Sequence, residues 1–395
     1  MTIELWLTGA LLVLLAGAGA AERLALARAR AALPIRIHVN GTRGKSTVTR
    51  LIWSALREAG VPTLAKTSGT AARLLLPDGS EQPIHRHAPA NIREQLRFML
   101  LARRLGVRAV VVECMALRPE LQWTTEHDIL RATIGVITNV RTDHTEVMGP
   151  TLAEIAASLA NTVPRGAVLV TGESRHAEAL ISRAAALRAR VVEAALDAAD
   201  GTAAATAPAG WLAEDLAVAL AVTRELGIPD AVARAGMAAA PPDPGAATSG
   251  AAGICGRSLL WLDATAANDP ESFTQLLAGA GLGEVSSPAS RPPAPTGGLL
   301  VVFNHRLDRP NRLLAFAAGG DNFRKARSLM VTGDRPPLTV WLRLRRLYGA
   351  ALRFVPSARL ARALAGAAPE TGGIVFCGNT RGLDVAAILA VAKHG

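Results

Sequence analysis

The segment IRIHVNGTRGKST occupies residues 35–47. Its first six residues read as a short strand, its middle as a glycine-rich turn, and its end as the start of a helix expected from about Lys45 to Ala59. Glycines let backbone N–H groups converge on phosphate oxygens, and the start of a helix adds a favourable field. This order predicts a phosphate-binding loop made of Gly41, Thr42, Arg43, Gly44, Lys45, Ser46 and Thr47.

The end of that loop points to ATP and magnesium. Lys45 is one of only four lysines in the chain, and it stands where an ammonium reaches the β- and γ-phosphates. The hydroxyl of Ser46 is placed to bind Mg²⁺. The loop has two residues between its glycines, whereas the commonest P-loop has four.

Further apolar runs predict that the strand belongs to a parallel sheet covered by helices on both faces. These runs lie at 107–113, 132–139 and 167–171, with helical stretches between them. Thr151 and Glu154 form a capping box, which predicts a helix from Thr151 to Val163.

A Pro- and Gly-rich stretch at 241–256 reads as a linker, and a second alternation of strand-like and helical runs follows it. We therefore expect an α/β fold with a P-loop parallel-sheet ATP-binding domain at 34–240. A smaller C-terminal Rossmann-like α/β domain is expected at 246–395, and a membrane anchor with a basic juxtamembrane segment at 1–33.

An acid and an Asp-His pair follow two of the predicted strands. Glu113 ends the first of these runs, and Asp143-His144 comes after the second. Ligands of open α/β sheets bind at the carboxyl ends of the strands, so these side chains are expected beside the loop. Ser46 and Glu113 suit Mg²⁺ as oxygen donors, while His144 suits Mn²⁺ better, or a second metal or a water. We expect one metal–phosphate site formed by Ser46, Glu113 and His144, in which Lys45, Glu113 and His144 are catalytic.

Composition narrows the class of protein. The 395 residues are 50% apolar and 19% charged, enough core for two or three domains and too apolar for a disordered chain. Three distant cysteines exclude a disulfide framework and indicate a reducing compartment. The net charge is +11, and residues 301–353 hold eleven Lys and Arg against three acids. A basic patch of this kind attracts anions. The alternative interpretation is that these arginines simply lie on solvent-exposed faces. Aromatic residues are only 4%, which argues against nucleic acid as a partner.

The N-terminus carries a run of 17 uncharged residues, Leu5–Ala21. That length is the lower limit for a membrane-spanning helix. Arginines follow the run at positions 23, 28 and 30, which places that side in the cytoplasm. A cleaved signal peptide is the alternative, because Ala18-Gly19-Ala20 resembles a cleavage site, but a positively charged leader is missing.

Together these motifs resemble the Mur ligase superfamily, whose members use ATP to join a carboxylate to an amino acid amine. Within it, the chain is most similar to the ligase subunits of poly-γ-glutamate synthases. The resemblance covers nearly the whole chain. The matching stretches are 40–51, 66–70, 113–116, Asn139, 143–151, 241–245, 266–272, 304–309 and 378–379.

The resemblance implies the reaction and its participants. ATP would bind on the loop with Mg²⁺ or Mn²⁺, the γ-carboxylate of a glutamyl chain would become an acyl phosphate, and a glutamate amine would form a γ-amide. Asn268 would also contact the nucleotide, and Lys66, Thr70, Arg306 and Arg309 would contact substrate. The expected partners are glutamate, the growing poly-γ-glutamate chain, the cell membrane and other membrane subunits of a polymer synthase, with the catalytic part cytoplasmic.

Two departures from the family pattern bear on the metal site. Related ligases often carry a lysine, carbamylated to bridge two magnesium ions, on the helix after the Asp-His pair. Here no lysine occurs between Lys66 and Lys325, and Leu159 lies about where it would fall. Glu146 stands where many Mur ligases have an aspartate.

Two other functions stay open at this level. One is another Mur-type ligase, acting on folate or a peptidoglycan precursor, although the apolar N-terminus argues against it. The other is a membrane-tethered P-loop ATPase module, which would hydrolyse ATP without an acceptor.

Overall fold

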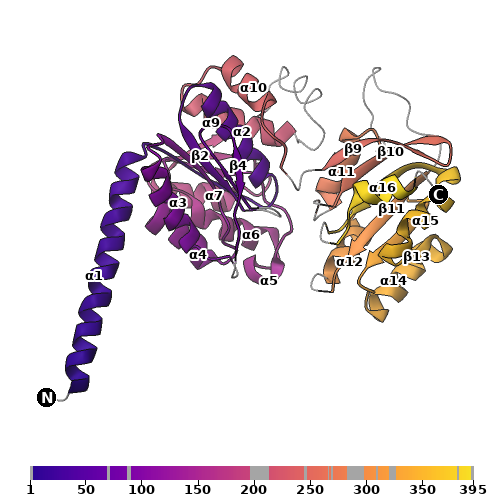
Figure 1. The fold of residues 1–395 in the computed structure, drawn as a ribbon, viewed down its shortest axis with the longest axis horizontal. Helices are drawn as coiled ribbons and strands as arrows, with labels where there is room; N and C mark the ends of the chain where they lie inside the picture. The colour runs from indigo at the N-terminus through magenta and orange to yellow at the C-terminus, as the bar shows by residue number, and fades with distance from the viewer. Residues whose placement is uncertain are drawn as a thin grey trace. The chain divides into compact units, whose positions relative to one another are not determined.

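A computed structural model gives the fold and describes residues 3–68, 72–86, 90–195, 213–243, 247–265, 267, 270–282, 298–307, 310–319, 326–379 and 382–392. The chain divides into two compact units, one of Met1–Asp200 with Ala213–Pro244 and one that contains Gly245–Gly395. Each unit is a sheet with helices on both faces, as the sequence predicts (Figure 1).

The first sheet has the order β4-β3-β2-β5-β1-β6-β7-β8 within the described residues. Neighbours from β2 to β8 are parallel, and β3 and β4 add an antiparallel edge that the sequence did not predict. Its strands are β1 (Ile35–Asn40), β2 (Thr63–Thr67), β3 (Arg73–Leu75), β4 (Glu81–Pro83), β5 (Ala109–Glu113), β6 (Ile134–Ile137), β7 (Val168–Thr171) and β8 (Arg190–Glu193).

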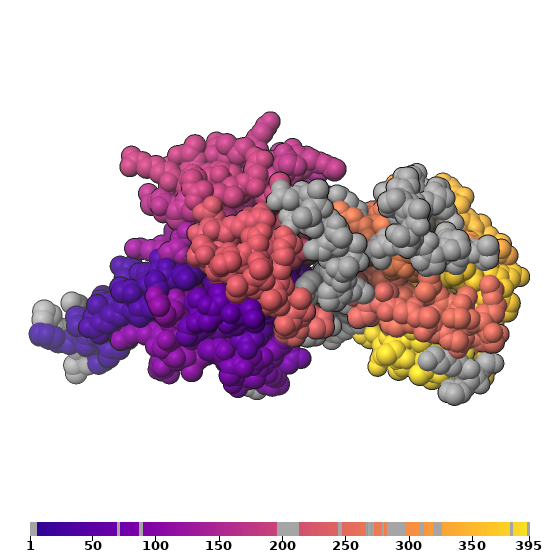
Figure 2. All heavy atoms as spheres, turned by 90° about the horizontal axis from the view of Figure 1, so that it is seen from above, coloured from indigo at the N-terminus to yellow at the C-terminus, as the bar shows by residue number. Residues whose placement is uncertain are grey.

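Helices cover both faces of this sheet. The contacts place α2, α9 and α10 on one face and α3, α4, α6 and α7 on the other. In the space-filling view, the salmon atoms of α9 and α10 lie against the violet atoms of the N-terminal part of the unit (Figure 2). The helices are α1 (Ile3–Ala32), α2 (Lys45–Glu58), α3 (Arg93–Arg104), α4 (Pro119–Trp123), the π-helix η1 (Thr124–Leu130), α5 (Thr145–Met148), α6 (Leu152–Leu159), the short 3₁₀ turn η2 (Ala160–Thr162), α7 (Glu178–Leu187), α9 (Ala213–Glu225) and α10 (Asp230–Ala238).

The local signals in the sequence are confirmed where they were strongest. Helix α2 begins at Lys45 directly after the loop, and α6 begins with the predicted capping box. In that box the Glu154 N–H donates to Thr151 Oγ1 at 3.2 Å, and the Thr151 N–H donates to Glu154 Oε2 at 3.0 Å. Two backbone N–H groups that would lack partners at the helix start are thereby satisfied.

The second unit has a sheet of order β13-β12-β11-β14-β10-β9 within the described residues, parallel except for β9. Its apolar side chains form one core cluster under α11, α12 and α14 and another under α15 and α16. The strands are β9 (Thr248–Ile254), β10 (Arg257–Ala264), β11 (Gly298–His305), β12 (Ser328–Gly333), β13 (Leu352–Phe354) and β14 (Thr371–Cys377). The helices are α11 (Pro270–Gly279), α12 (Pro310–Gly319), α14 (Leu338–Tyr348), η3 (Gly349–Ala351), η4 (Ser357–Arg359), α15 (Leu360–Ala367), η5 (Ala368–Glu370) and α16 (Val385–Ala392).

The linker prediction for 241–256 was too long. Residues 248–254 form β9, which pairs antiparallel with β10. Apart from Ile254, its residues are Gly, Ala, Ser and Thr, which lack the alternation of bulky side chains that indicates a strand.

Helix α1 is part of the first unit at one end only. Leu26 and Ala29 are buried in a core cluster with Phe98 and Met99 of α3. Residues 6–21 are exposed, and that part extends away from the rest of the unit (Figure 1). Among the described residues, Trp6–Ala32 is the one helix long and apolar enough to cross a membrane.

Candidate active site

The loop between β1 and α2 has a shape that only glycine allows at two positions. Gly41 has φ 132° and Gly44 has φ 76°, both in the region that side chains disfavour. A Cβ on Gly41 would lie 2.0 Å from Thr138 Oγ1, and one on Gly44 would lie 1.9 Å from Asp215 Oδ1. Thr138 and Asp215 therefore pack directly against the backbone of the loop at these two glycines.

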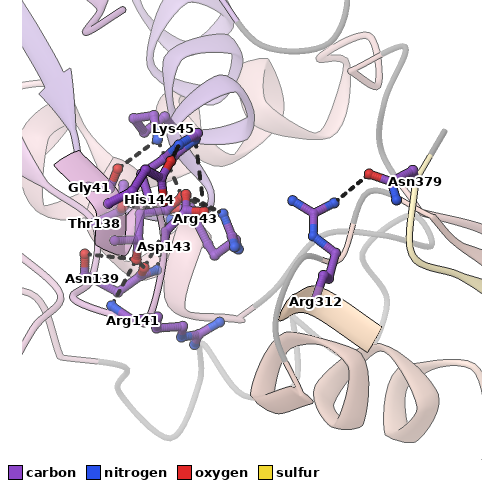
Figure 3. A network of polar contacts seen from close by, with 12 residues as sticks. Gly41, Arg43, Lys45, Thr138, Asn139, Arg141, Asp143, His144, Arg312 and Asn379 are labelled. Atoms are coloured by element: carbon purple, nitrogen blue, oxygen red, sulfur yellow. Dashed lines mark hydrogen bonds and ion pairs between the residues drawn. The ribbon is translucent and has the colours of Figure 1, made fainter. Parts of the chain in front are cut away.

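Asn139, just after β6, holds the loop from one side (Figure 3). Its Oδ1 accepts from Thr42 Oγ1 at 2.7 Å and from the Arg43 N–H at 3.0 Å. Its carbonyl accepts from the Thr42 N–H at 3.2 Å. Thr138 Oγ1 donates to the Arg43 carbonyl. Hydrogen bonds from a rigid strand end thus preorganise the backbone that would receive phosphate.

Lys45 lies over this loop. Its Nζ donates to the carbonyls of Gly41 at 2.6 Å and Thr42 at 3.3 Å (Figure 3). The ammonium is therefore held within the loop, in the region where a bound phosphate would need a positive charge.

Ser46 and Glu113 meet on the other side of the loop, as predicted. Ser46 Oγ donates to Glu113 Oε2 at 2.8 Å, and the Ser68 N–H donates to the same oxygen at 2.7 Å. Glu113 ends β5 and is 2% exposed. A buried carboxylate beside a hydroxyl offers the hard oxygen donors that Mg²⁺ prefers, so this pair fits a magnesium ion.

His144 lies with a different group of residues. It has φ 44°, a left-handed backbone, and its Nδ1 is 3.1 Å from Glu146 Oε1. Its Nε2 is 4.0 Å from Asp143 Oδ1. Arg43 donates to Asp143 Oδ2 at 2.8 Å. Burial alone would raise the pKa of Asp143, but the charge and hydrogen bond of Arg43 lower it below its usual value.

The structure thus brings together two of the three predicted metal ligands. No group of three or more His, Cys, Asp or Glu side chains that could hold a metal occurs among the described residues. Leu159, which we expect near the place of the bridging lysine in related ligases, is 1% exposed and packs in an apolar core cluster. The role of His144 as a ligand therefore stays a prediction.

Lys66, a predicted substrate residue, is buried at the end of β2. Its Nζ donates to Gln95 Oε1 at 3.1 Å and lies 3.3 Å from Glu94 Oε2. Burial lowers the pKa of this lysine, although Glu94 opposes that shift. Gln95 in turn donates to the Glu113 carbonyl at 3.1 Å. A chain of polar contacts therefore joins Lys66 to the strand that carries Glu113.

Several contacts of the loop were not predicted from the sequence. Arg141 donates to both carboxylate oxygens of Glu214, at 2.7 and 2.9 Å. The Arg141 N–H donates to Thr42 Oγ1 at 2.9 Å. Glu214 comes from the start of α9, more than 70 residues away along the chain, and no local motif marks it.

The remaining predicted residues belong to the second unit or lie outside the described part. In the second unit, Arg306 follows β11, whose end is held by a hydrogen bond from Asn304 Nδ2 to the Asn379 carbonyl at 2.6 Å. Arg312 donates to Asn379 Oδ1 at 2.8 Å (Figure 3). Thr70, Asn268 and Arg309 lie outside the described residues.

Comparison with known proteins identifies the family. A model of the Mur ligase middle domain matches residues 39–209, and a model of the poly-γ-glutamate synthase CapB C-terminal domain matches residues 252–393. PGA synthase CapB of Bacillus subtilis (strain 168) is 35% identical over 305 residues, which are 77% of this chain and 75% of that protein. This chain belongs to the CapB family.

A second relative agrees with CapB membership, and a solved structure shares the fold. The capsule biosynthesis protein CapB of Bacillus anthracis is 34% identical over 304 residues, 76% of this chain and 64% of that protein. A structure of a bifunctional folylpolyglutamate synthase/dihydrofolate synthase with Mn, AMPPNP and L-glutamate bound is 18% identical with a TM-score of 0.61, covering 94% of this chain and 91% of that one. The Mur ligase fold and the class of ATP-dependent ligase are thus confirmed for this CapB-family chain.

Proposed function

We propose that this CapB-family ligase joins glutamate units through γ-amide bonds, with ATP bound on the Gly41–Thr47 loop. The observation that carries the site is the loop itself, held between Glu113 at the end of β5 and Asn139 after β6. The family relationship supports the substrate, because the matched model and the Bacillus subtilis relative are named for poly-γ-glutamate synthesis.

In the proposed reaction, a γ-carboxylate oxygen of a glutamyl chain attacks the γ-phosphorus of ATP, and the bond to ADP breaks. The resulting acyl phosphate is attacked at its carbonyl carbon by a glutamate amine, which loses a proton as phosphate leaves. Phosphoryl transfer depends mainly on positioning and on neutralising charge. Lys45 would supply a positive charge at the loop. The N–H groups of Thr42 and Arg43 donate to Asn139, so those that follow them, at the start of α2, would hold the phosphates.

Magnesium would be held by Ser46 and Glu113, whose facing oxygens are 2.8 Å apart. When bound, the ion neutralises charge on the transferred phosphoryl group. His144 would orient a water or support Mn²⁺ from the Asp143 side of the loop. Lys66, buried beside the Glu113 strand, would bind a substrate carboxylate.

The N-terminal helix supports a membrane location. Its residues 6–21 are exposed and apolar, while arginines at 23, 28 and 30 follow on the side of the ligase unit. Under the positive-inside rule, the catalytic part would lie in the cytoplasm and the helix would anchor it. Glutamate, the growing chain and other membrane subunits would be its partners.

The test combines product analysis with an isotope. Glutamate oligomers carrying ¹⁸O in the γ-carboxylate are incubated with the full chain, ATP, Mg²⁺ and unlabelled glutamate. An acyl phosphate requires one ¹⁸O atom in the released phosphate and a γ-linked product one residue longer. Lys45→Ala should lower turnover by about two or more orders of magnitude. ATP hydrolysis at full rate without glutamate, giving unlabelled phosphate, would identify an ATPase module instead.

A further inference from the structure

A cavity lies at the amino edge of the first sheet, opposite the nucleotide loop. Its volume is about 810 Å³, within the usual range for ligand pockets. It is lined by residues near the starts of three neighbouring strands: Arg36 in β1, Thr133 before β6, and Ala167 before β7. Arg36 is five residues before Gly41, so about 17 Å of strand separates the cavity from the loop. The cavity is thus distinct from the ATP site.

One wall of the cavity is made of unusual backbone. The π-helix η1 contributes Glu126, His127 and Asp128. π-helical turns are rare and are found often at functional sites. Arg131 directly follows with φ 48°, a conformation that costs energy for a residue with a side chain. Its Nε donates to the His127 carbonyl at 3.0 Å.

The same wall is fixed from behind. Arg36 Nε donates to the Arg131 carbonyl at 3.0 Å, and its Nη1 donates to the Leu33 carbonyl at 2.6 Å. Glu126 accepts from the Ala132 N–H at 2.8 Å and pairs with the buried His38 at 2.9 Å. The ring of Trp123 lies against that of His127, with centroids 3.7 Å apart. The cavity wall is therefore rigid and preorganised.

The lining carries an excess of positive charge. Three arginines from separate segments of the chain line it: Arg36, Arg131 and Arg165. The Arg36 guanidinium donates to backbone carbonyls and contributes its charge, while Arg131 and Arg165 are the two that can contact an anion. Two acidic residues line the cavity, Glu126 and Asp128. Glu126 is paired with His38, so Asp128 is the remaining negative charge opposite the arginines. Arg165 is exposed and has no hydrogen bond or ion pair with any described residue. Burial lowers the pKa of His127, and the nearby Arg165 lowers it further.

We propose that this cavity is a second anion site, which holds carboxylates of the γ-glutamyl chain while the opposite edge of the sheet uses ATP. The proposal rests on the proposed function for the identity of the chain. Guanidinium groups bind carboxylates bidentately, and Arg131 and Arg165, which come from separate segments, suit a ligand that carries more than one carboxylate.

The position of α1 favours this chain over a lipid headgroup. Because Leu26 and Ala29 are packed in protein, lipid contact ends before them. Arg30 donates to the Asp128 carbonyl at 2.8 Å, so the cavity wall lies beside Arg30. Arg30 is eight residues along α1 from Glu22, the first charged residue after the apolar run. Eight residues of helix rise about 12 Å, whereas the headgroup layer is only about 5–8 Å thick. The cavity therefore stands beyond the headgroups.

The test measures binding of a fluorescent γ-linked glutamate oligomer of about ten residues to the full chain in neutral detergent, with and without saturating AMPPNP. The test variant is Arg131→Asn with Arg165→Gln, since asparagine tolerates the left-handed conformation at 131. Its Kd should rise by about tenfold or more, as two charge-assisted contacts are lost. The matched control is Arg188→Asn, an exposed arginine with φ 56° outside the cavity, and its Kd should equal that of the wild type.

The outcomes separate the two proposals. Equal oligomer affinity in the test variant and the Arg188→Asn control overturns the cavity proposal, even when the isotope assay gives a γ-linked product. Cavity-dependent oligomer binding without any γ-linked product refutes the proposed function and leaves an anion site. If the variant loses affinity only for phosphatidylglycerol vesicles, the cavity binds headgroups and the proposal is wrong.

Discussion

Replacing Gly44 by alanine tests whether the nucleotide loop depends on the close packing seen around it. The new Cβ meets two obstacles. The residue has φ 76°, which costs an L-residue about 1–2 kcal/mol. The Cβ also lies 1.9 Å from Asp215 Oδ1 and 2.8 Å from its Cγ, so α9 or the loop must move. Overpacking of this kind costs about 1–3 kcal/mol.

Gly60, just after α2, provides the matched control. It has φ 72°, nearly the same as Gly44, yet a Cβ there meets nothing within 4 Å. Gly60→Ala should lower the free energy of unfolding by about 1–2 kcal/mol through backbone strain alone. Gly44→Ala should lower it by about 2–5 kcal/mol, the sum of strain and overpacking.

Denaturant unfolding measures both variants, and calorimetric titration with an ATP analogue measures the loop. ATP affinity should fall by about tenfold or more in Gly44→Ala, because about 1.4 kcal/mol of the strain and overpacking energy acting on the bound state is enough for a tenfold change in Kd. It should not change in Gly60→Ala. In a double-mutant cycle with Asp215→Ala, the overpacking part should disappear, giving a coupling of about 1–3 kcal/mol. Equal losses in the two glycine variants, with ATP affinity intact, would refute the reasoning.

Three further predictions concern the metal, the buried histidine and the anchor. Glu113→Gln should lower turnover by about two orders of magnitude at limiting Mg²⁺ and leave metal-free binding of the ATP analogue unchanged; a Mg²⁺ dependence like that of the wild type would remove Glu113 from the site. Burial alone would lower the pKa of His38, but Cys114 and Glu126 raise it to about 9. The wild type should therefore be more stable than His38→Gln by the full amount below pH 6.5, and this difference in unfolding free energy should shrink by up to about 3 kcal/mol as the pH rises to 9. A difference that does not change over this range would contradict a charged His38. Deleting residues 2–21 should yield a chain that no longer sediments with membranes and still binds ATP. Deleting residues 2–30 should also lower the unfolding temperature, because Leu26 and Ala29 are then missing from the core. Equal unfolding temperatures of the two deletion variants would contradict that packing.

The sequence predicts the loop and its strand and helix because their signals are local. Glycine spacing, a lysine after the second glycine and a capping box each act over a few residues, and the structure confirms β1, α2 and α6. The meeting of Ser46 with Glu113 was also predictable. Glu113 is at the carboxyl end of β5, and Ser46 is in the first turn of the helix that follows the carboxyl end of β1.

The rest depends on contacts between distant parts of the chain. Strands β3 and β4 have three residues each, too few to show a periodicity. β3 is stabilised by pairing with β2, and β4 by pairing with β3. Glu214 reaches the loop region only because α9 packs on the sheet. The arginines at 36, 131 and 165 are unremarkable in an arginine-rich chain until folding gathers them around one cavity.

The way α1 enters the core bears on how the ligase would sit at a membrane. Two residues separate the end of α1 at Ala32 from the start of β1 at Ile35, and Leu33 between them is fully buried. The connection between the helix and the sheet is therefore rigid, so the first unit cannot rotate independently of α1. If α1 lies in a bilayer, the first unit would be held at a fixed distance from the lipid surface by this short connection. The helix and the first unit would then diffuse in the plane of the membrane as one body, with the nucleotide loop at a constant height above the lipid.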